Sequence, residues 1–360
     1  MRIYNTPIMY NYNVKNKDVN SQPNFKGVKS LSSVKDGHGI EYGMRILGNK
    51  FNDFFATKGQ KQLTKNIANI KVEPTRLYME QLSEIGRLYS TQKVIDVNIE
   101  DSILEKLAEK GESIIFVMNH SNQSEDPQML AVLNTLLTDA YKKTGREDFP
   151  LPKIILNEDI LTTMNPTKRK AFENFGAVGV DASIEGGDSS VNARALFPLV
   201  KDFVRNKCNI FIFPEGRLAV SKTLDLQGRF QPGVASLINK MLGIKKKVTV
   251  VPVGFAYGKG EKKTLTAMNI GTPLEIKREG ITTTITRGDV DKNKDSILYS
   301  FFGKHSGEQD VSITKNGEPV EPKDVTGFLK TIICDNLETN SNIAKKKLEI
   351  PLEKDGFEMY

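Results

Sequence analysis

Cysteine, histidine and tryptophan are scarce in this chain of 360 residues, which contains two, three and none of them, respectively. The two cysteines, Cys208 and Cys334, are isolated from each other in the sequence. This pattern excludes a disulfide framework and a paired-cysteine metal site, and it is typical of a reducing cytoplasm.

Long apolar runs are also missing. No window approaches the roughly 18 uninterrupted apolar residues of a membrane-spanning helix, and the N-terminus lacks the apolar core of a signal peptide. We therefore expect a cytoplasmic protein whose membrane contact, if any, is peripheral, on the inner face of the cell membrane. The net charge of +7 suits a phosphorylated substrate, an anionic membrane or nucleic acid. Since no RNA-recognition signature, zinc pattern or basic heptad helix is present, we do not expect nucleic acid as a partner.

The N-terminal third divides into two parts. Residues 1–38 are rich in Asn, Lys and Ser without any period and are predicted to be a disordered arm. Residues 39–110 are predicted to be a helical segment, in which 73–111 form two helices joined by a linker. The apolar face that includes Phe51, Phe54 and Phe55 either packs on the protein body or lies in a membrane interface as a basic amphipathic helix.

Strand and helix patterns alternate from residue 111 onward. The predicted strands are 113–119, 152–156, 177–180, 209–213 and 247–257, and the predicted helices are 127–143, 168–175, 189–206 and 233–242. This order predicts an α/β fold with a mostly parallel central sheet and helices on both faces. We place the catalytic domain at 111–280. Residues 281–360 are predicted to form a C-terminal α+β extension of unknown role, with a hairpin at Asn316-Gly317 and a helix at 327–338.

Polar residues follow two of these strands, where sites in α/β sheets lie. His120 ends one strand, with Glu125 and Asp126 just downstream. A carboxylate on one ring nitrogen of a histidine leaves the other nitrogen free to act as a general base, while Asp126 before Pro127 is also a good helix start. The second strand runs into Pro-Glu-Gly-Arg, 214–217. Its arginine suits a phosphate, although a structural ion pair explains the Glu and Arg equally well.

Five motifs in order resemble those of one enzyme family. They are "NHSNQSEDP", "NFGAVGVDAS", "FPEGR", "FQPGVASLI" and "VVPVGFAY", all within 110–275. The chain resembles the glycerolipid acyltransferase superfamily, which includes glycerol-3-phosphate and 1-acylglycerol-3-phosphate O-acyltransferases.

The resemblance implies a mechanism. His120 would be the base that takes a proton from an acceptor hydroxyl, which attacks the thioester of acyl-CoA or acyl carrier protein. Asp126 or Glu125 would orient the histidine, and we expect Asp126, since it is followed by Pro. Glu215 and Gly216 would belong to the acceptor-binding motif, and Arg217 would bind the phosphate of a glycerolipid acceptor. No metal or other cofactor is required.

Two departures from the family pattern concern the acceptor and the dyad. Five residues, not four, separate His120 from Asp126, and Asp181 stands near the position of an arginine that helps to hold phosphate. Arg169 and Lys170 are candidate substitutes, or else form a solvated helix face. The alternatives are therefore a glycolipid or other lysophospholipid acceptor, or an inactive lipid- or acyl-carrier-binding homologue. A serine thioesterase is disfavoured, because the chain lacks a Gly-x-Ser-x-Gly elbow.

Overall fold

The structure is a computed structural model. It describes residues 58–70, 94–98, 103–120, 126–146, 148–181, 189–215, 232–259, 264–287, 309–312, 314–315, 318–319, 325–355 and 358–359.

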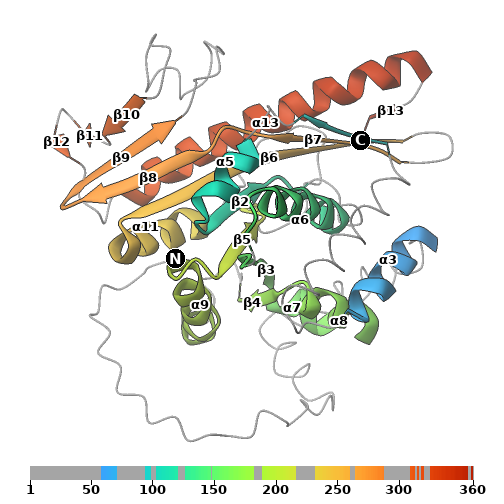
Figure 1. The fold of residues 1–360 in the computed structure, drawn as a ribbon, viewed down its shortest axis with the longest axis horizontal. Helices are drawn as coiled ribbons and strands as arrows, with labels where there is room; N and C mark the ends of the chain where they lie inside the picture. Colours follow the sequence, from blue (N-terminus) through green and yellow to red (C-terminus); the bar gives the residue numbers. More distant parts are fainter. Residues whose placement is uncertain are drawn as a thin grey trace, which may run out of the picture.

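Figure 1 shows the described elements along the chain. The helices are α3 (Lys58–Ala68), α5 (Ile103–Lys110), α6 (Asp126–Lys143), α7 (Glu158–Thr163), α8 (Pro166–Asn174), α9 (Ser189–Val204), α11 (Gly233–Lys245) and α13 (Val325–Asp355). The strands are β1 (Val94–Asn98), β2 (Ile114–Met118), β3 (Leu151–Asn157), β4 (Ala177–Val180), β5 (Cys208–Ile212), β6 (Lys247–Lys259), β7 (Thr264–Ile270), β8 (Leu274–Glu279), β9 (Thr282–Arg287), β10 (Gln309–Ser312), β11 (Thr314–Lys315), β12 (Glu318–Pro319) and β13 (Glu358–Met359).

The centre of the fold is a parallel sheet in the strand order β6-β2-β5-β3-β4. In its register, Phe116 of β2 lies between Phe211 of β5 and Val251 of β6. The predicted α/β class, with a mostly parallel central sheet, is confirmed. The carboxyl ends of neighbouring parallel strands meet at one edge, so the residues that follow β2 and β5 come together there.

Antiparallel strands extend the sheet beyond β6. β8, β9 and β10 follow one another on that side, and β7 pairs with the later part of β6. β1 pairs in parallel with β7. This strand lies within 73–111, which we predicted to be two helices joined by a linker and not to contain a strand. β11 and β12 pair in antiparallel orientation, and the predicted Asn316-Gly317 turn lies outside the described residues.

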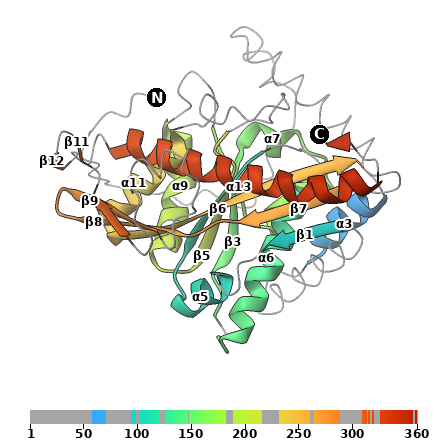
Figure 2. The same ribbon diagram turned by 90° about the horizontal axis from the view of Figure 1, so that it is seen from above.

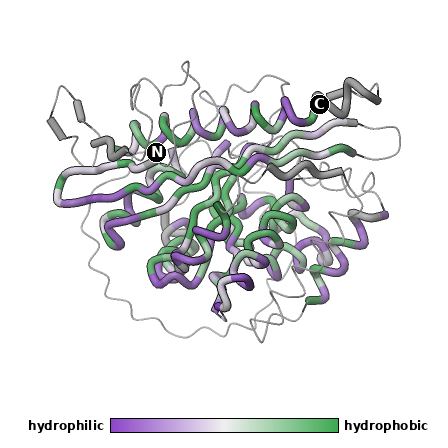
Figure 3. The backbone as a smooth tube through the Cα atoms, turned by 45° about the horizontal axis from the view of Figure 1, so that its top comes forward, coloured by the Kyte–Doolittle hydropathy of each residue, from purple (hydrophilic) through white to green (hydrophobic). Residues whose placement is uncertain are grey.

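Helices cover both faces of the sheet, and successive β2 side chains point into opposite cores. Phe116 packs with α5 and α6, whereas Ile115 and Val117 pack with α9, α11 and α13. The two layers are visible on either side of the sheet in Figure 2, and the strands at the centre of the sheet appear mostly green in Figure 3.

α13 is longer than the helix that we predicted at 327–338, and it covers one face of the sheet. Leu329, Ile333 and Leu337 are fully buried in the core on that face. This part of the C-terminal extension therefore closes the core of the catalytic domain.

α3 packs on the protein body. Leu63 and Ile67 of this helix are buried in the core, and the Asn174 side chain donates to the Ile67 and Ala68 carbonyl oxygens at 2.9 and 3.1 Å. The packing and membrane-interface interpretations of the face with Phe51, Phe54 and Phe55 both remain predictions. The predicted arm at 1–38 and the Phe51–Phe55 stretch lie outside the described residues. Within the part of the chain that is described, no helix is long and apolar enough to cross a membrane.

Candidate active site

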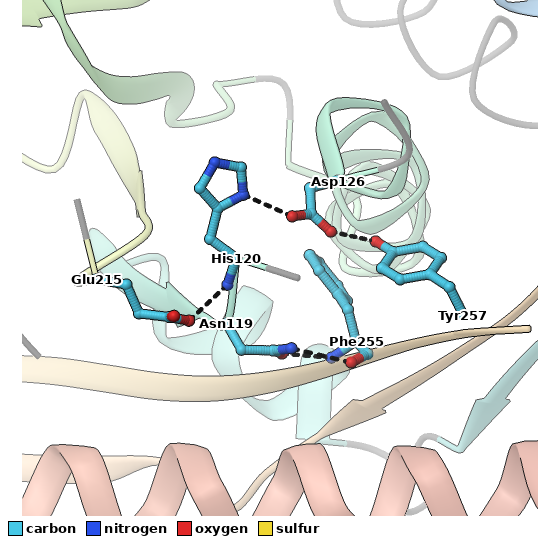
Figure 4. Close-up of polar contacts among 6 residues, drawn as sticks. All are labelled: Asn119, His120, Asp126, Glu215, Phe255 and Tyr257. Atoms are coloured by element: carbon cyan, nitrogen blue, oxygen red, sulfur yellow. Dashed lines mark hydrogen bonds and ion pairs between the residues drawn. The ribbon is translucent and has the colours of Figure 1, made fainter. Parts of the chain in front are cut away.

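His120 and Asp126 lie together at the carboxyl end of β2. The Nδ1 atom of His120 is 2.6 Å from Oδ2 of Asp126, as Figure 4 shows. Because an ionised carboxylate only accepts hydrogen bonds, this contact favours the tautomer with the proton on Nδ1, in which Nε2 is the accepting nitrogen. The His120 side chain keeps 19% of its surface exposed while that of Asp126 is fully buried, which is the arrangement that a general base and its orienting acid require.

The second oxygen of Asp126 has its own partner. The Tyr257 hydroxyl donates to Oδ1 of Asp126 at 2.5 Å. Burial disfavours the charge of a carboxylate, whereas two hydrogen bonds and a place at the first residue of α6 favour it. The chain thus surrounds this buried acid with groups that hold its negative charge.

The main chain around His120 is fixed by two side-chain contacts. The Asn119 amide group donates to the Phe255 carbonyl at 3.0 Å and accepts from the Phe255 N–H at 2.7 Å, so that it bridges β2 to β6 like a further strand residue. The Glu215 carboxylate accepts from the His120 backbone N–H at 2.8 Å. The ring of Phe213 lies 4.8 Å from the imidazole, centroid to centroid. Together these contacts determine where the imidazole points.

Glu215 lies beside His120. It is only 1% exposed, and one oxygen of its carboxylate accepts from the His120 backbone N–H. This contact gives Glu215 a part in holding His120, and its predicted place in the acceptor-binding motif remains a prediction. Gly216, Arg217 and Glu125 lie outside the described residues, so their predicted roles remain predictions.

The two candidate phosphate ligands on α8 lie away from His120. Arg169 pairs with Glu173 on the same helix, with Nε 2.9 Å from Oε1, and Lys170 is exposed. α8 leads into β4, which is separated from β2 by β5 and β3, a distance of about 14 Å at ordinary strand spacing. This arrangement favours the solvated-face interpretation of both residues.

Asp181 follows β4 at the edge of the sheet where His120 follows β2. The Asn192 side chain of α9 accepts from the Asp181 N–H at 2.8 Å and donates to its carbonyl at 3.0 Å. Asn119 forms the same pair of hydrogen bonds with the backbone of Phe255. The backbone that places Asp181 at this edge is therefore fixed.

Both cysteines are free and buried. Burial raises the pKa of the Cys208 and Cys334 thiols to about 12, so both stay neutral at ordinary pH. Among the described residues, no group of His, Cys, Asp and Glu side chains has the arrangement of a metal site.

Sequence reasoning named His120, Asp126 and Glu215 but missed Tyr257 and gave Asn119 no role. The signal for Tyr257 was weak, although it ends the "VVPVGFAY" motif. Alternation along β6 places it on the same face as Val253 and Phe255, but only the tertiary fold shows that this face looks toward the start of α6.

A comparison with protein families agrees with the class of enzyme that the dyad indicates. Residues 97–256 match the protein family described as Acyltransferase, and this segment is an acyltransferase domain, as the sequence motifs indicated. A search of curated proteins found no match.

Among solved structures, the chain is similar to the 1-acyl-sn-glycerophosphate (LPA) acyltransferase PlsC from Thermotoga maritima. The sequence identity is 13%, the alignment covers 83% of this chain and 97% of that chain, and the TM-score is 0.38. Since this likeness is slight, the assignment depends on the family match and on the geometry around His120.

Proposed function

We propose that this protein transfers a fatty acyl group from acyl-CoA or acyl carrier protein to a hydroxyl of a glycerol-phosphate-type acceptor, 1-acylglycerol 3-phosphate or glycerol 3-phosphate, in phospholipid synthesis. The observation that carries the proposal is the 2.6 Å contact between His120 and a fully buried Asp126, within a domain that matches the acyltransferase family.

The chemistry follows from the free nitrogen of His120. Nε2 takes the proton of the acceptor hydroxyl while its oxygen bonds to the thioester carbonyl carbon. The tetrahedral intermediate then breaks its C–S bond, and the departing thiolate receives that proton from the imidazolium. An ester and a free thiol are formed, and Asp126 stabilises the imidazolium between the two steps.

The dyad geometry bears on the inactive alternative. That alternative supposed that the five-residue spacing separates the histidine from its acid, yet the two side chains are within hydrogen-bonding distance. The described residues thus retain the arrangement that base catalysis needs, which supports an active enzyme over a lipid- or acyl-carrier-binding homologue.

The position of Asp181 supports a second candidate acceptor. Its backbone is held at the edge of the sheet where His120 lies, but three strand spacings away from it, so its charge repels an acceptor phosphate that binds on the β4 side of the site. A glycolipid or another lysophospholipid is therefore the alternative acceptor.

An acceptor screen tests the proposal. Release of free thiol from acyl-CoA is measured alone and with glycerol 3-phosphate, 1-acylglycerol 3-phosphate, a glycolipid or a neutral-headgroup lysophospholipid. His120→Ala serves as the inactive control, for which general-base loss predicts a fall of about 10²–10⁴-fold. Acceptor-dependent release with a phosphorylated glycerolipid is expected. Release without any acceptor would indicate a thioesterase, and full activity of His120→Ala would contradict the mechanism.

The membrane contact belongs to the same proposal. The net charge is +7, and a lipid acceptor resides in an anionic bilayer. We place the enzyme at the cytoplasmic face of the cell membrane as a peripheral protein. α3 packs its apolar face on the protein body and leaves Lys58, Lys61 and Lys65 exposed, so an N-terminal contribution to this contact comes from its basic outer face or from residues before Lys58.

A further inference from the structure

Tyr257 reaches the candidate active site from a strand far away in the sequence. Its side chain is 4% exposed, and its hydroxyl donates to Oδ1 of Asp126, while Oδ2 of the same carboxylate contacts His120. The carboxylate in Figure 4 lies between the imidazole and the phenol. Each oxygen of Asp126 therefore faces a different side chain.

The Asp126 carboxylate has a second favourable orientation, which competes with the one that contacts His120. It is the first residue of α6, and an aspartate there tends to turn its carboxylate toward the unpaired backbone N–H groups of its own helix. A hydroxyl supplied by another element opposes that rotation, because it holds one oxygen outside the helix axis. The other oxygen then stays aimed at Nδ1 of His120.

We propose that Tyr257 is a positioning residue for acyl transfer, which holds the carboxylate of Asp126 in the rotamer that keeps the Nδ1 proton of His120 in place. This inference rests on the proposed function for its kinetic consequences. Tyr257 acts through Asp126 and does not itself touch the reacting groups.

A single strand then positions both members of the dyad. The backbone of Phe255 in β6 forms two hydrogen bonds with the side chain of Asn119, which precedes His120. Tyr257 lies two residues further along β6 and donates to Asp126. Because residues two apart on a strand point to the same face, their separation is fixed by the strand itself. The distance between base and acid is thus set by β6, and not only by the loop that joins them in sequence.

The test replaces Tyr257 with phenylalanine, which keeps the ring in the core and removes only the hydroxyl. We expect kcat to fall about tenfold to a hundredfold, since loss of alignment by an ångström costs this much. The KM values for donor and acceptor should stay within about twofold, because no substrate contact is removed.

Tyr141→Phe is the matched control. Tyr141 is also fully buried, its hydroxyl accepts from Asn209 at 3.4 Å, and burial raises its pKa to about 12. It lies on α6 about 22 Å along the helix from Asp126. We expect this variant to keep wild-type kcat although it loses a buried hydroxyl in the same way.

A double-mutant cycle separates positioning from general support of the fold. In an Asp126→Asn background, Tyr257→Phe should cost less than about twofold, because the His120 tautomer that the orientation of Asp126 maintains is already lost. A kcat of Tyr257→Phe within twofold of wild type would overturn the proposal. So would an equal loss in both backgrounds, or the same loss in Tyr141→Phe.

A spectroscopic readout keeps the proposal testable whatever the enzyme acylates. The ¹⁵N shifts of the His120 ring report which nitrogen carries the proton. We expect the Nδ1–H tautomer in the wild type and in Tyr141→Phe, and a mixture in Tyr257→Phe. An unchanged tautomer in Tyr257→Phe refutes the positioning role. A shifted tautomer in a protein without acyl transfer would refute only the proposed function. If Tyr257→Phe does not fold, the NMR signal of the Tyr257 hydroxyl proton is compared between the wild type and Asp126→Asn. An unchanged chemical shift of this proton in Asp126→Asn would refute the contact between Tyr257 and Asp126.

Discussion

Replacing Asp126 with asparagine is the sharpest perturbation of the candidate active site. In the wild type, Oδ1 of Asp126 lies 2.5 Å from the Tyr257 hydroxyl and Oδ2 lies 2.6 Å from Nδ1 of His120. Asparagine has the same shape, so its amide oxygen can still accept from the Tyr257 hydroxyl. Its NH₂ group then takes the place of Oδ2 and faces Nδ1 of His120. Nδ1 must become the acceptor, and the ring proton moves to Nε2. The base nitrogen is then blocked by its own hydrogen.

The expected loss follows from this change of tautomer. Removing general-base function costs about 10²–10⁴-fold in rate, which corresponds to about 3–5 kcal/mol of transition-state stabilisation. The KM for either substrate should change little, because Asp126 is fully buried and touches neither. The assay is acceptor-dependent release of thiol from acyl-CoA, with both substrates varied.

Glu125→Gln is the control for this prediction, since it removes the same charge one position earlier. We expect it to keep activity within a few-fold of wild type. If Glu125→Gln lost more rate than Asp126→Asn, the acid that serves His120 would be Glu125. If neither variant lost activity, the dyad would have no part in turnover.

Four further predictions address the acceptor site, the membrane, the core and the thiols. Arg217→Ala should raise the KM for the acceptor by about 10- to 150-fold, for a lost charged hydrogen bond of about 1.5–3 kcal/mol; a change in the donor KM alone would place this arginine on the donor side. Deleting residues 1–57 should weaken binding to anionic vesicles while activity on a soluble short-chain substrate persists, and unchanged vesicle binding would remove that segment from the membrane contact. Gly254→Ala should lower the free energy of unfolding by about 1–3 kcal/mol or more in a urea titration, because its Cβ would lie 2.2 Å from a backbone oxygen of α13; wild-type stability would mean that α13 shifts at no cost. Both cysteines, whose pKa values burial raises to about 12, should resist a thiol reagent in the native protein and react after denaturation, and rapid labelling of the native protein would show that this core opens.

The strands and helices that the sequence predicted well are those whose pattern is local. β4 was predicted with the bounds that the structure shows, and β2 within one residue at each end. The apolar run of β2 is bounded by Ser113 and Asn119, that of β5 ends before Pro214, and the helices between strands carry apolar stripes. α7 was missed because "EDILTT" is too short to show a helical period. β1 was missed because the short segment "VIDVN" forms a strand by pairing with β7. β7 follows it by more than 160 residues, so no local pattern indicates the pairing.

The same distinction holds for the candidate active site. His120 and Asp126 are close in sequence, so their partnership was predictable from residue type and from the proline that follows. The contacts of Glu215 with His120 and of Tyr257 with Asp126 span 95 and 131 residues. They depend on the strand order β6-β2-β5, which is set by how the two cores pack and not by any local pattern. The contact of the Glu215 carboxylate with the His120 backbone was for this reason not predicted.

The spacing between His120 and Asp126 shows how the fold accommodates one additional residue. Leu130, Leu133 and Leu137 of α6 are at most 1% exposed, so shifting this helix along its axis would disrupt the packing of a whole face. Its first residue is also tied to β6, through Asp126 and the Tyr257 hydroxyl. Lengthening a loop by one residue costs only a fraction of a kcal/mol in closure entropy. The additional residue is therefore accommodated between His120 and Asp126, while both ends of that connection stay fixed by β6.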